Sequence, residues 1–102
     1  MEYKIVLTRR AQLDFRNITH YLLYELKSEQ AAISVTNDME KTIERLSYTA
    51  GGLKLCEDPQ LRDLGYRTIY FKLHNYFILY RIQDGVVYVD AIYHDLQDYE
   101  SF

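Results

Sequence analysis

The sequence predicts an α+β fold in the order β-α-α-β-β-β, with a twisted, mainly antiparallel sheet and an N-terminal helix hairpin packed on one face. Two observations predict it. Apolar residues recur every three or four positions between Ala11 and Leu46, which is the spacing of buried helix faces. From Gly65 onward the period changes to two, and Asp84–Gly85 interrupts the alternation as a strong hairpin turn signal.

The first half of the chain is expected to form one strand and two helices. Tyr3–Leu7 has the β-branched and apolar content of a short strand, and Thr8 follows as a helix N-cap. Ser28 caps the second helix, and Gly51–Gly52 ends it, because glycine tolerates the left-handed conformation at a helix end. The turn between the helices is short, which predicts an antiparallel hairpin. The apolar stripes are Ala11, Phe15, Ile18, Leu22 and Leu26, then Ala32, Val35, Met39, Ile43 and Leu46.

The second half is expected to form a loop and then three strands. Leu53–Leu64 is irregular and holds the only proline, Pro59, so we interpret it as a surface loop. The strands are Tyr66–Leu73, Tyr76–Ile82 and Val86–Tyr93, with two-residue turns at His74–Asn75 and Asp84–Gly85.

Those turns set a register for the sheet. They place Ile82 opposite Val87, Tyr80 opposite Val89, Ile78 opposite Ala91, Phe71 opposite Ile78 and Ile69 opposite Tyr80. One face is then apolar and packs under the helices: Ile69, Phe71, Ile78, Tyr80, Ile82, Val87, Val89 and Ala91. The other face carries Thr68, Tyr70, Lys72, Phe77, Leu79, Arg81, Tyr88, Asp90 and Ile92. Nothing else in the chain is left to cover this second face, so we expect it to bind a partner.

Composition narrows the class of protein. A chain of 102 residues with 48% hydrophobic and 26% charged residues fits one globular domain, residues 1–102. The lone cysteine, Cys56, and the lack of a Cys/His cluster predict no structural metal, and we expect no cofactor. No apolar run is long enough to span a membrane and no signal-peptide pattern is present, so we expect a cytoplasmic protein. The net charge of −3 argues against a protein whose main task is wrapping nucleic acid.

Two segments resemble the RelE/ParE toxins of bacterial type II toxin–antitoxin (plasmid stabilisation) modules. The segment Ala11–Tyr21 (AQLDFRNITHY) resembles the first-helix pattern of ParE, and Asn75–Ile82 (NYFILYRI), the aspartate-glycine turn and Ala91–His94 (AIYH) resemble the two terminal strands. Gly65-Tyr66-Arg67 is similar to the glycine-x-arginine that often opens the second strand. With the order of elements, the resemblance covers nearly the whole chain.

The resemblance implies one of two mechanisms. RelE-type toxins are endonucleases that cut mRNA on the ribosome, whereas ParE-type toxins poison DNA gyrase, and an antitoxin neutralises both types. The long helix hairpin resembles ParE. RelE-like nucleases place an arginine at the start of the third strand and a basic or His/Tyr cluster at the end of the fourth; here Phe77 and Asp95 occupy such positions. We therefore expect a gyrase-binding toxin; the alternatives are a ribosome-dependent mRNA endonuclease and a degenerate homologue that binds its antitoxin without toxicity.

His94 is the one candidate general acid–base if the chain is an endonuclease, because imidazole titrates near neutral pH, although a structural hydrogen bond is equally expected for it. Arg67 is expected to neutralise the carboxyl ends of the helices. The antitoxin is expected to bind the second face of the sheet through exposed aromatics and cations. The residues expected there are Tyr70, Lys72, Phe77, Leu79, Arg81 and Tyr88.

Overall fold

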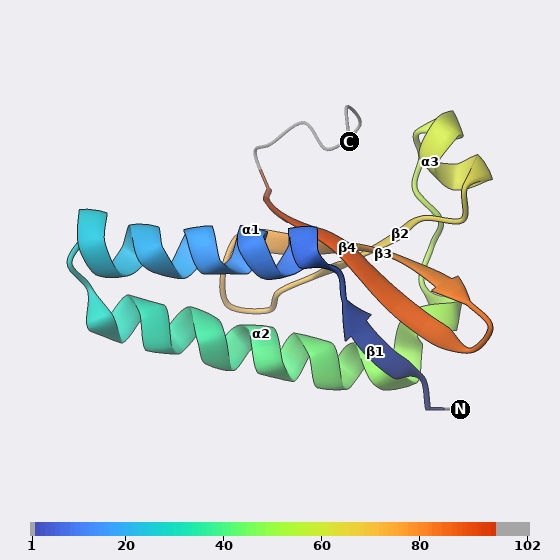
Figure 1. Ribbon diagram of the computed structural model, residues 1–102. Coiled ribbons are helices and arrows are strands. Elements are labelled where there is room, and N and C mark those ends of the chain that lie inside the picture. The colour runs from blue at the N-terminus through green and yellow to red at the C-terminus, as the bar shows by residue number, and fades with distance from the viewer. Residues whose placement is uncertain (1, 96–102) are drawn as a thin grey trace.

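A computed structural model describes residues 2–95 and confirms the predicted α+β architecture. Its elements are β1 (Lys4–Leu7), α1 (Arg9–His20), a π-helical turn (Tyr21–Glu25), α2 (Glu29–Thr49), a 3₁₀ turn (Ala50–Gly52), α3 (Pro59–Asp63), β2 (Arg67–Tyr70), β3 (Tyr76–Gln83) and β4 (Val86–His94). The sheet order is β1-β4-β3-β2, with β1 parallel to β4 and the other neighbours antiparallel. The α1/α2 hairpin lies on one side of the sheet and projects beyond it (Figure 1). Within residues 2–95, no helix is long and apolar enough to cross a membrane.

Both helices begin at the predicted caps. The Thr8 hydroxyl accepts a hydrogen bond from the Ala11 N–H at 3.3 Å, and the Ser28 hydroxyl accepts one from Ala31 at 3.1 Å. The predicted stripes contribute Ala11, Val35, Met39 and Leu46 to the core. Leu26, predicted as the last residue of the first stripe, is instead 55% exposed, in the turn between the helices. Local sequence therefore accounts for the hairpin.

The glycines at the end of α2 act differently from the prediction. Neither Gly51 nor Gly52 has a positive φ; the two glycines with positive φ are Gly65 and Gly85. A Cβ atom on Gly51 would collide with the Tyr3 hydroxyl, so this glycine makes room for the segment leading into β1. The Tyr3 N–H also donates to the Ser47 carbonyl at 2.7 Å, which ties β1 to the end of α2.

The register prediction is right near the β3–β4 turn and wrong beyond it. Asp84 and Gly85 have φ of 52° and 76°, as a two-residue hairpin of mirror-image type requires, and Tyr80 pairs with Val89 as predicted. Asp90 is then an extra residue, so Leu79 rather than Ile78 pairs with Ala91. This bulge exchanges the two faces at the end of β4: Ile92 joins the core under the helices, and Ala91 lies on the opposite face.

The β2–β3 connection is longer than the predicted His74–Asn75 turn. The last pair of β2 is Tyr70 with Phe77, and Ile69 pairs with Ile78. The strand ends early because the buried carboxylate of Asp38 accepts hydrogen bonds from the N–H groups of Lys72, at 3.3 Å, and Leu73, at 2.9 Å, drawing the chain out of the sheet. The shift is two residues, so side-chain faces in β2 and β3 remain as predicted.

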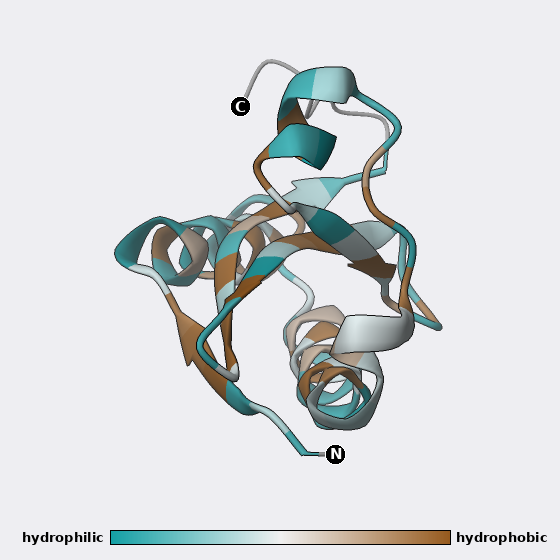
Figure 2. Ribbon diagram, turned by 90° about the vertical axis from the view of Figure 1, so that its right-hand side faces the viewer, coloured by the Kyte–Doolittle hydropathy of each residue, from teal (hydrophilic) through white to brown (hydrophobic). Residues whose placement is uncertain are grey.

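The interpretation of Leu53–Leu64 as a surface loop is wrong in its second half. Asp58 caps α3 through its carboxylate, which accepts the Leu61 N–H at 3.0 Å, and Pro59 occupies the first turn. The segment covers the sheet face opposite the helix hairpin (Figure 2). A second core forms there from Cys56, Leu61, Tyr66, Phe77, Leu79, Ala91 and Tyr93. The expectation that nothing in the chain covers this face is therefore wrong.

Candidate functional site

A polar cleft lies between α1 and the adjoining ends of β3 and β4. It is lined by Asp14, Asn17, Ile18, Tyr21, Tyr76, Ile92 and His94. The bulge in β4 creates this arrangement, because it turns Ile92 and His94 toward α1. The His94 ring meets the edge of the Tyr76 ring, with centroids 5.4 Å apart. Burial, with a smaller effect of Tyr21, raises the pKa of the Tyr76 phenol, so Tyr76 stays neutral at physiological pH.

Asp14 holds this end of β4 to α1. Its carboxylate accepts the Ile92 N–H at 3.0 Å, which satisfies a backbone donor next to the bulge. The Asp14 carboxylate also lies 3.7 Å from Arg10 Nε, and Arg10 donates to the Tyr93 hydroxyl at 2.9 Å. The Asp14–Ile92 contact could not be predicted from sequence, because it depends on a bulge that sequence did not reveal.

The composition of the cleft limits its chemistry. It offers one imidazole, one carboxylate engaged by the backbone and two phenols, and the residues that line it within 2–95 include no lysine or arginine. Cleavage of RNA needs a base to activate the 2′-hydroxyl. It also needs cations to stabilise the negative charge of the phosphorane-like transition state. In the described part of the chain, no three His, Cys, Asp or Glu side chains gather as a metal site would require. The described lining therefore supplies an imidazole but no cation that would hold a phosphate.

Of the predicted antitoxin-binding residues, two lie in the second core. Phe77 is 1% exposed and Leu79 is fully buried. The Phe77 ring lies between Tyr70, at a centroid distance of 5.1 Å, and Tyr93, at 5.6 Å. Segment 53–64, which was expected to be a free loop, covers them. Their expected role as directly contacting anchors is therefore inconsistent with the structure.

The other four residues reach the surface. Tyr70 and Lys72 are exposed, and Arg81 and Tyr88 are partly buried. Arg81 is already engaged: its Nε lies 2.9 Å from the Asp90 carboxylate, and its guanidinium stacks over the Tyr88 ring at 4.7 Å. The Tyr66 hydroxyl donates to the same carboxylate at 2.8 Å. Burial lowers the pKa of Arg81, but Asp90 and Tyr66 together raise it by more, and the guanidinium remains charged.

Arg67 donates a hydrogen bond to the Leu53 carbonyl, just beyond the 3₁₀ turn that ends α2. This contact fits the structural role expected for it near the carboxyl end of that helix.

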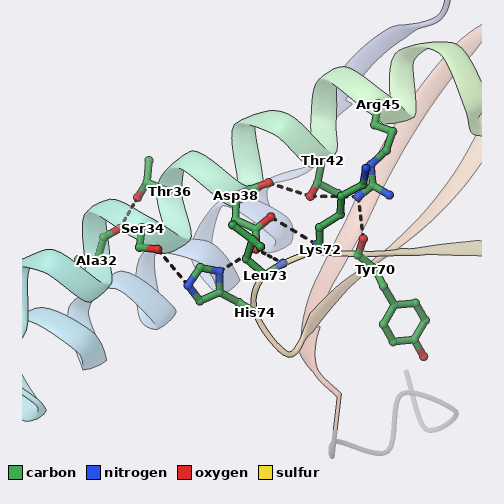
Figure 3. Close-up of polar contacts among 10 residues, drawn as sticks. All are labelled: Ala32, Ser34, Thr36, Asp38, Thr42, Arg45, Tyr70, Lys72, Leu73 and His74. Atoms are coloured by element: carbon green, nitrogen blue, oxygen red, sulfur yellow. Dashed lines mark hydrogen bonds and ion pairs between the residues drawn. The ribbon is translucent and has the colours of Figure 1, made fainter.

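A second polar site, which the sequence analysis missed, joins α2 to the β2–β3 connection (Figure 3). Asp38 is 3% exposed, and besides the two backbone N–H groups it contacts His74 Nδ1 at 2.7 Å. The other ring nitrogen of His74 lies 3.2 Å from the Ser34 hydroxyl. Burial raises the pKa of the Asp38 carboxyl, but the hydrogen bonds from His74, Leu73 and Lys72 lower it by more. The sequence offered one indication of this site: the carboxylate of Asp38 directly precedes Met39, a residue of the predicted buried stripe of α2.

The sequence model of the protein family described as the ParE toxin of type II toxin–antitoxin systems matches residues 5–99 of this chain. The chain belongs to the ParE toxin family. Its fold is also that of one chain of the chromosomal ParDE toxin–antitoxin system from P. aeruginosa, with a TM-score of 0.72 at 19% identity, covering 91% of this chain and 96% of that chain. No curated protein matches the sequence.

Family membership agrees with the resemblance carried by the first helix and the terminal strands. In this ParE-family chain, the position where RelE-like nucleases carry an arginine is held by Phe77, and that side chain is enclosed in the second core. His94 lies at the end of β4 as predicted, in the cleft beside α1. Asp95, which follows His94 where RelE-like nucleases would carry a basic cluster, is exposed, and its N–H donates to the Asn75 carbonyl at 2.8 Å.

Proposed function

We propose that this chain is the toxin of a type II toxin–antitoxin module, that it inhibits growth by binding DNA gyrase, and that a cognate antitoxin neutralises it. It acts in the cytoplasm as one toxin domain. Membership of the ParE family supports a toxin with an antitoxin partner. The choice of a binding mechanism over catalysis depends on the composition of the cleft.

The observation that carries this choice is that no lysine or arginine is among the residues that line the described part of the cleft holding His94. A ribonuclease must place positive charge beside the scissile phosphate, and Asp14 and the two tyrosines contribute none. Phe77, at the position where the resemblance to RelE-like nucleases would expect an arginine, is a buried apolar ring and supplies no positive charge. His94 alone could move a proton but could not stabilise the charge that develops on phosphate. The cleft therefore favours binding over RNA cleavage.

The antitoxin is proposed to use the exposed members of the predicted surface, above all Tyr70 and Lys72. Phe77 and Leu79 would act from beneath, by supporting Tyr70. A second exposed apolar surface is the groove between α1 and α2, lined by Phe15, Leu23 and Ile33 among others. Tyr70→Ala should weaken antitoxin binding by more than about 1 kcal/mol, the usual threshold for an interface anchor. If Tyr70→Ala binds normally and Ile33→Ala does not, the antitoxin binds the helix hairpin instead.

Inducing the toxin in a bacterial host and following events in time tests the mechanism. The proposal predicts growth arrest with DNA damage signalling before any change in message integrity, and the same arrest with His94→Ala. Primer extension on translated mRNA is the counterpart measurement. Codon-phased cuts that disappear in His94→Ala would replace the proposal with the endonuclease. Normal growth with a folded protein that still binds its antitoxin would identify a degenerate homologue.

A further inference from the structure

A positively charged cavity lies between α2 and the β2–β3 connection. It is lined by Asp38, Lys41, Thr42, Arg45, Lys72 and Leu73. Three of these six side chains are cations, on a chain whose net charge is −3. The ion pairs found among residues 2–95 involve other cations: Arg10, His74 and Arg81.

Asp38, which also lines the cavity, is engaged elsewhere. Its two carboxylate oxygens accept from the N–H groups of Lys72 and Leu73 and contact the His74 ring. Arg45 donates to an uncharged acceptor, the Tyr70 carbonyl, at 2.8 Å. In Figure 3 the Lys72 side chain extends from the connection toward the Arg45 guanidinium. These contacts hold the Arg45 guanidinium and the backbone of Lys72 in place before any ligand arrives.

The three cations of the cavity outnumber its one carboxylate, Asp38. Lys41 and Arg45 are four positions apart on α2 and share a face, and like charges at that spacing destabilise a helix. Lys72 adds a third positive charge from the neighbouring connection. An anion entering the cavity would relieve this repulsion and could pair with the fork of the Arg45 guanidinium.

We propose that the cavity binds a carboxylate side chain of the antitoxin, an inference that rests on the proposed function for the existence of that partner. The flanks of the cavity suit a polypeptide: Leu73 is 75% exposed, Tyr70 is 52% exposed, and Tyr48, one helical turn after Arg45, is 62% exposed. Such a surface matches an acidic residue with apolar neighbours in the partner segment.

The cavity is less suited to phosphate. Phosphate sites in proteins usually supply free backbone N–H groups, and here those of Lys72 and Leu73 are taken by Asp38. A carboxylate can be held by side-chain cations alone, so the engagement of these N–H groups favours a carboxylate over phosphate.

Titration of the ¹⁵N-labelled chain with defined probes tests the cavity directly. The probes are the peptide acetyl-Leu-Glu-Leu-Glu-Leu-Glu-amide, the same peptide with glutamine at each glutamate, and inorganic phosphate. We expect the glutamate peptide to shift the amides of 41–45 and 70–74, and the other two probes to leave them unchanged. Lys72→Gln and Lys41→Gln should each weaken peptide binding about fivefold, the upper end for an exposed ion pair. Arg16→Gln, which removes an exposed cation of α1, is the matched control and should bind as wild type.

A second experiment measures binding of the antitoxin itself, which is defined as the protein whose co-expression restores growth. Calorimetry at two salt concentrations should show that Lys41→Gln and Lys72→Gln weaken its binding and reduce the salt dependence, whereas Arg16→Gln does neither. Equal binding by all variants, or peptide shifts confined to other residues, would overturn the inference and leave the proposed function standing. A phosphate response equal to that of the peptide would also overturn it. If no antitoxin restores growth, the proposed function fails, and the peptide titration still decides whether the cavity binds carboxylates.

Discussion

Removing the Asp38 carboxylate should destabilise the protein by about 2–4 kcal/mol. Hydrogen bonds to a charged acceptor are worth roughly 1.5–3 kcal/mol each, and two of the three at Asp38, from Leu73 at 2.9 Å and His74 at 2.7 Å, are short. The bond from Lys72 is long, at 3.3 Å. Asp38→Ala loses these bonds but also relieves the cost of keeping a charge buried, which is a few kcal/mol. The net loss should lower the melting temperature by at least about 10 °C in a domain of this size.

Urea denaturation followed by circular dichroism measures this loss. Glu40→Ala removes an exposed carboxylate from the same helix and serves as the control, with a change within about 0.5 kcal/mol. Since the pKa of Asp38 lies below its usual value in the folded chain, its contribution is present above about pH 4 and is lost as the pH falls through the folded pKa. The difference in unfolding free energy between wild type and Asp38→Asn should therefore shrink below about pH 4. A loss under about 1 kcal/mol for Asp38→Ala would refute the argument that this carboxylate anchors the β2–β3 connection.

Three further substitutions test the packing. Phe77→Ala should lower the free energy of unfolding by about 3–5 kcal/mol, because the ring is 1% exposed. An unchanged melting temperature would show that Phe77 is at the surface. Phe15→Ala should cost less, about 1–3 kcal/mol, since this side chain of the hairpin is only partly buried, and a larger loss would show a more enclosed site. Tyr66→Phe should cost about 1–2 kcal/mol by depriving the Asp90 carboxylate of a 2.8 Å hydrogen bond, and a neutral result would mean that Arg81 alone satisfies it.

The features predicted correctly from sequence are those encoded locally. Thr8 and Ser28 cap their helices because a hydroxyl reaches the N–H three residues ahead, and Asp84–Gly85 forms its turn because both residues tolerate positive φ. The order of elements follows from these signals and from the two periodicities. These predictions required no knowledge of contacts between distant segments of the chain.

The features that were missed depend on contacts between distant segments. The bulge at Asp90 is stabilised by Tyr66 and Arg81, and it reverses the faces of Ala91 and Ile92. The shortened β2 depends on Asp38, a helix residue more than thirty positions earlier. The cover of the second sheet face was not predicted for the same reason. A short helix and Cys56 cover this face, and the irregular sequence of segment 53–64, with its one proline, did not reveal them.

For the functional site, sequence predicted that His94 lies at the end of the last strand. It did not predict the cleft, because Asp14 and Tyr76 face His94 only through the bulged register. It also missed the cationic cavity, since Lys41 and Arg45 have the appearance of ordinary solvated helix residues until Lys72 is brought beside them.

The central claim is that this ParE-family chain acts by binding DNA gyrase rather than by cutting RNA. The most direct measurement is supercoiling of relaxed plasmid by purified gyrase with increasing amounts of the purified chain. The account predicts dose-dependent inhibition of supercoiling that His94→Ala retains and that addition of the antitoxin reverses. Unimpaired supercoiling at a large excess of the folded chain, together with codon-phased cleavage of mRNA on translating ribosomes, would contradict it.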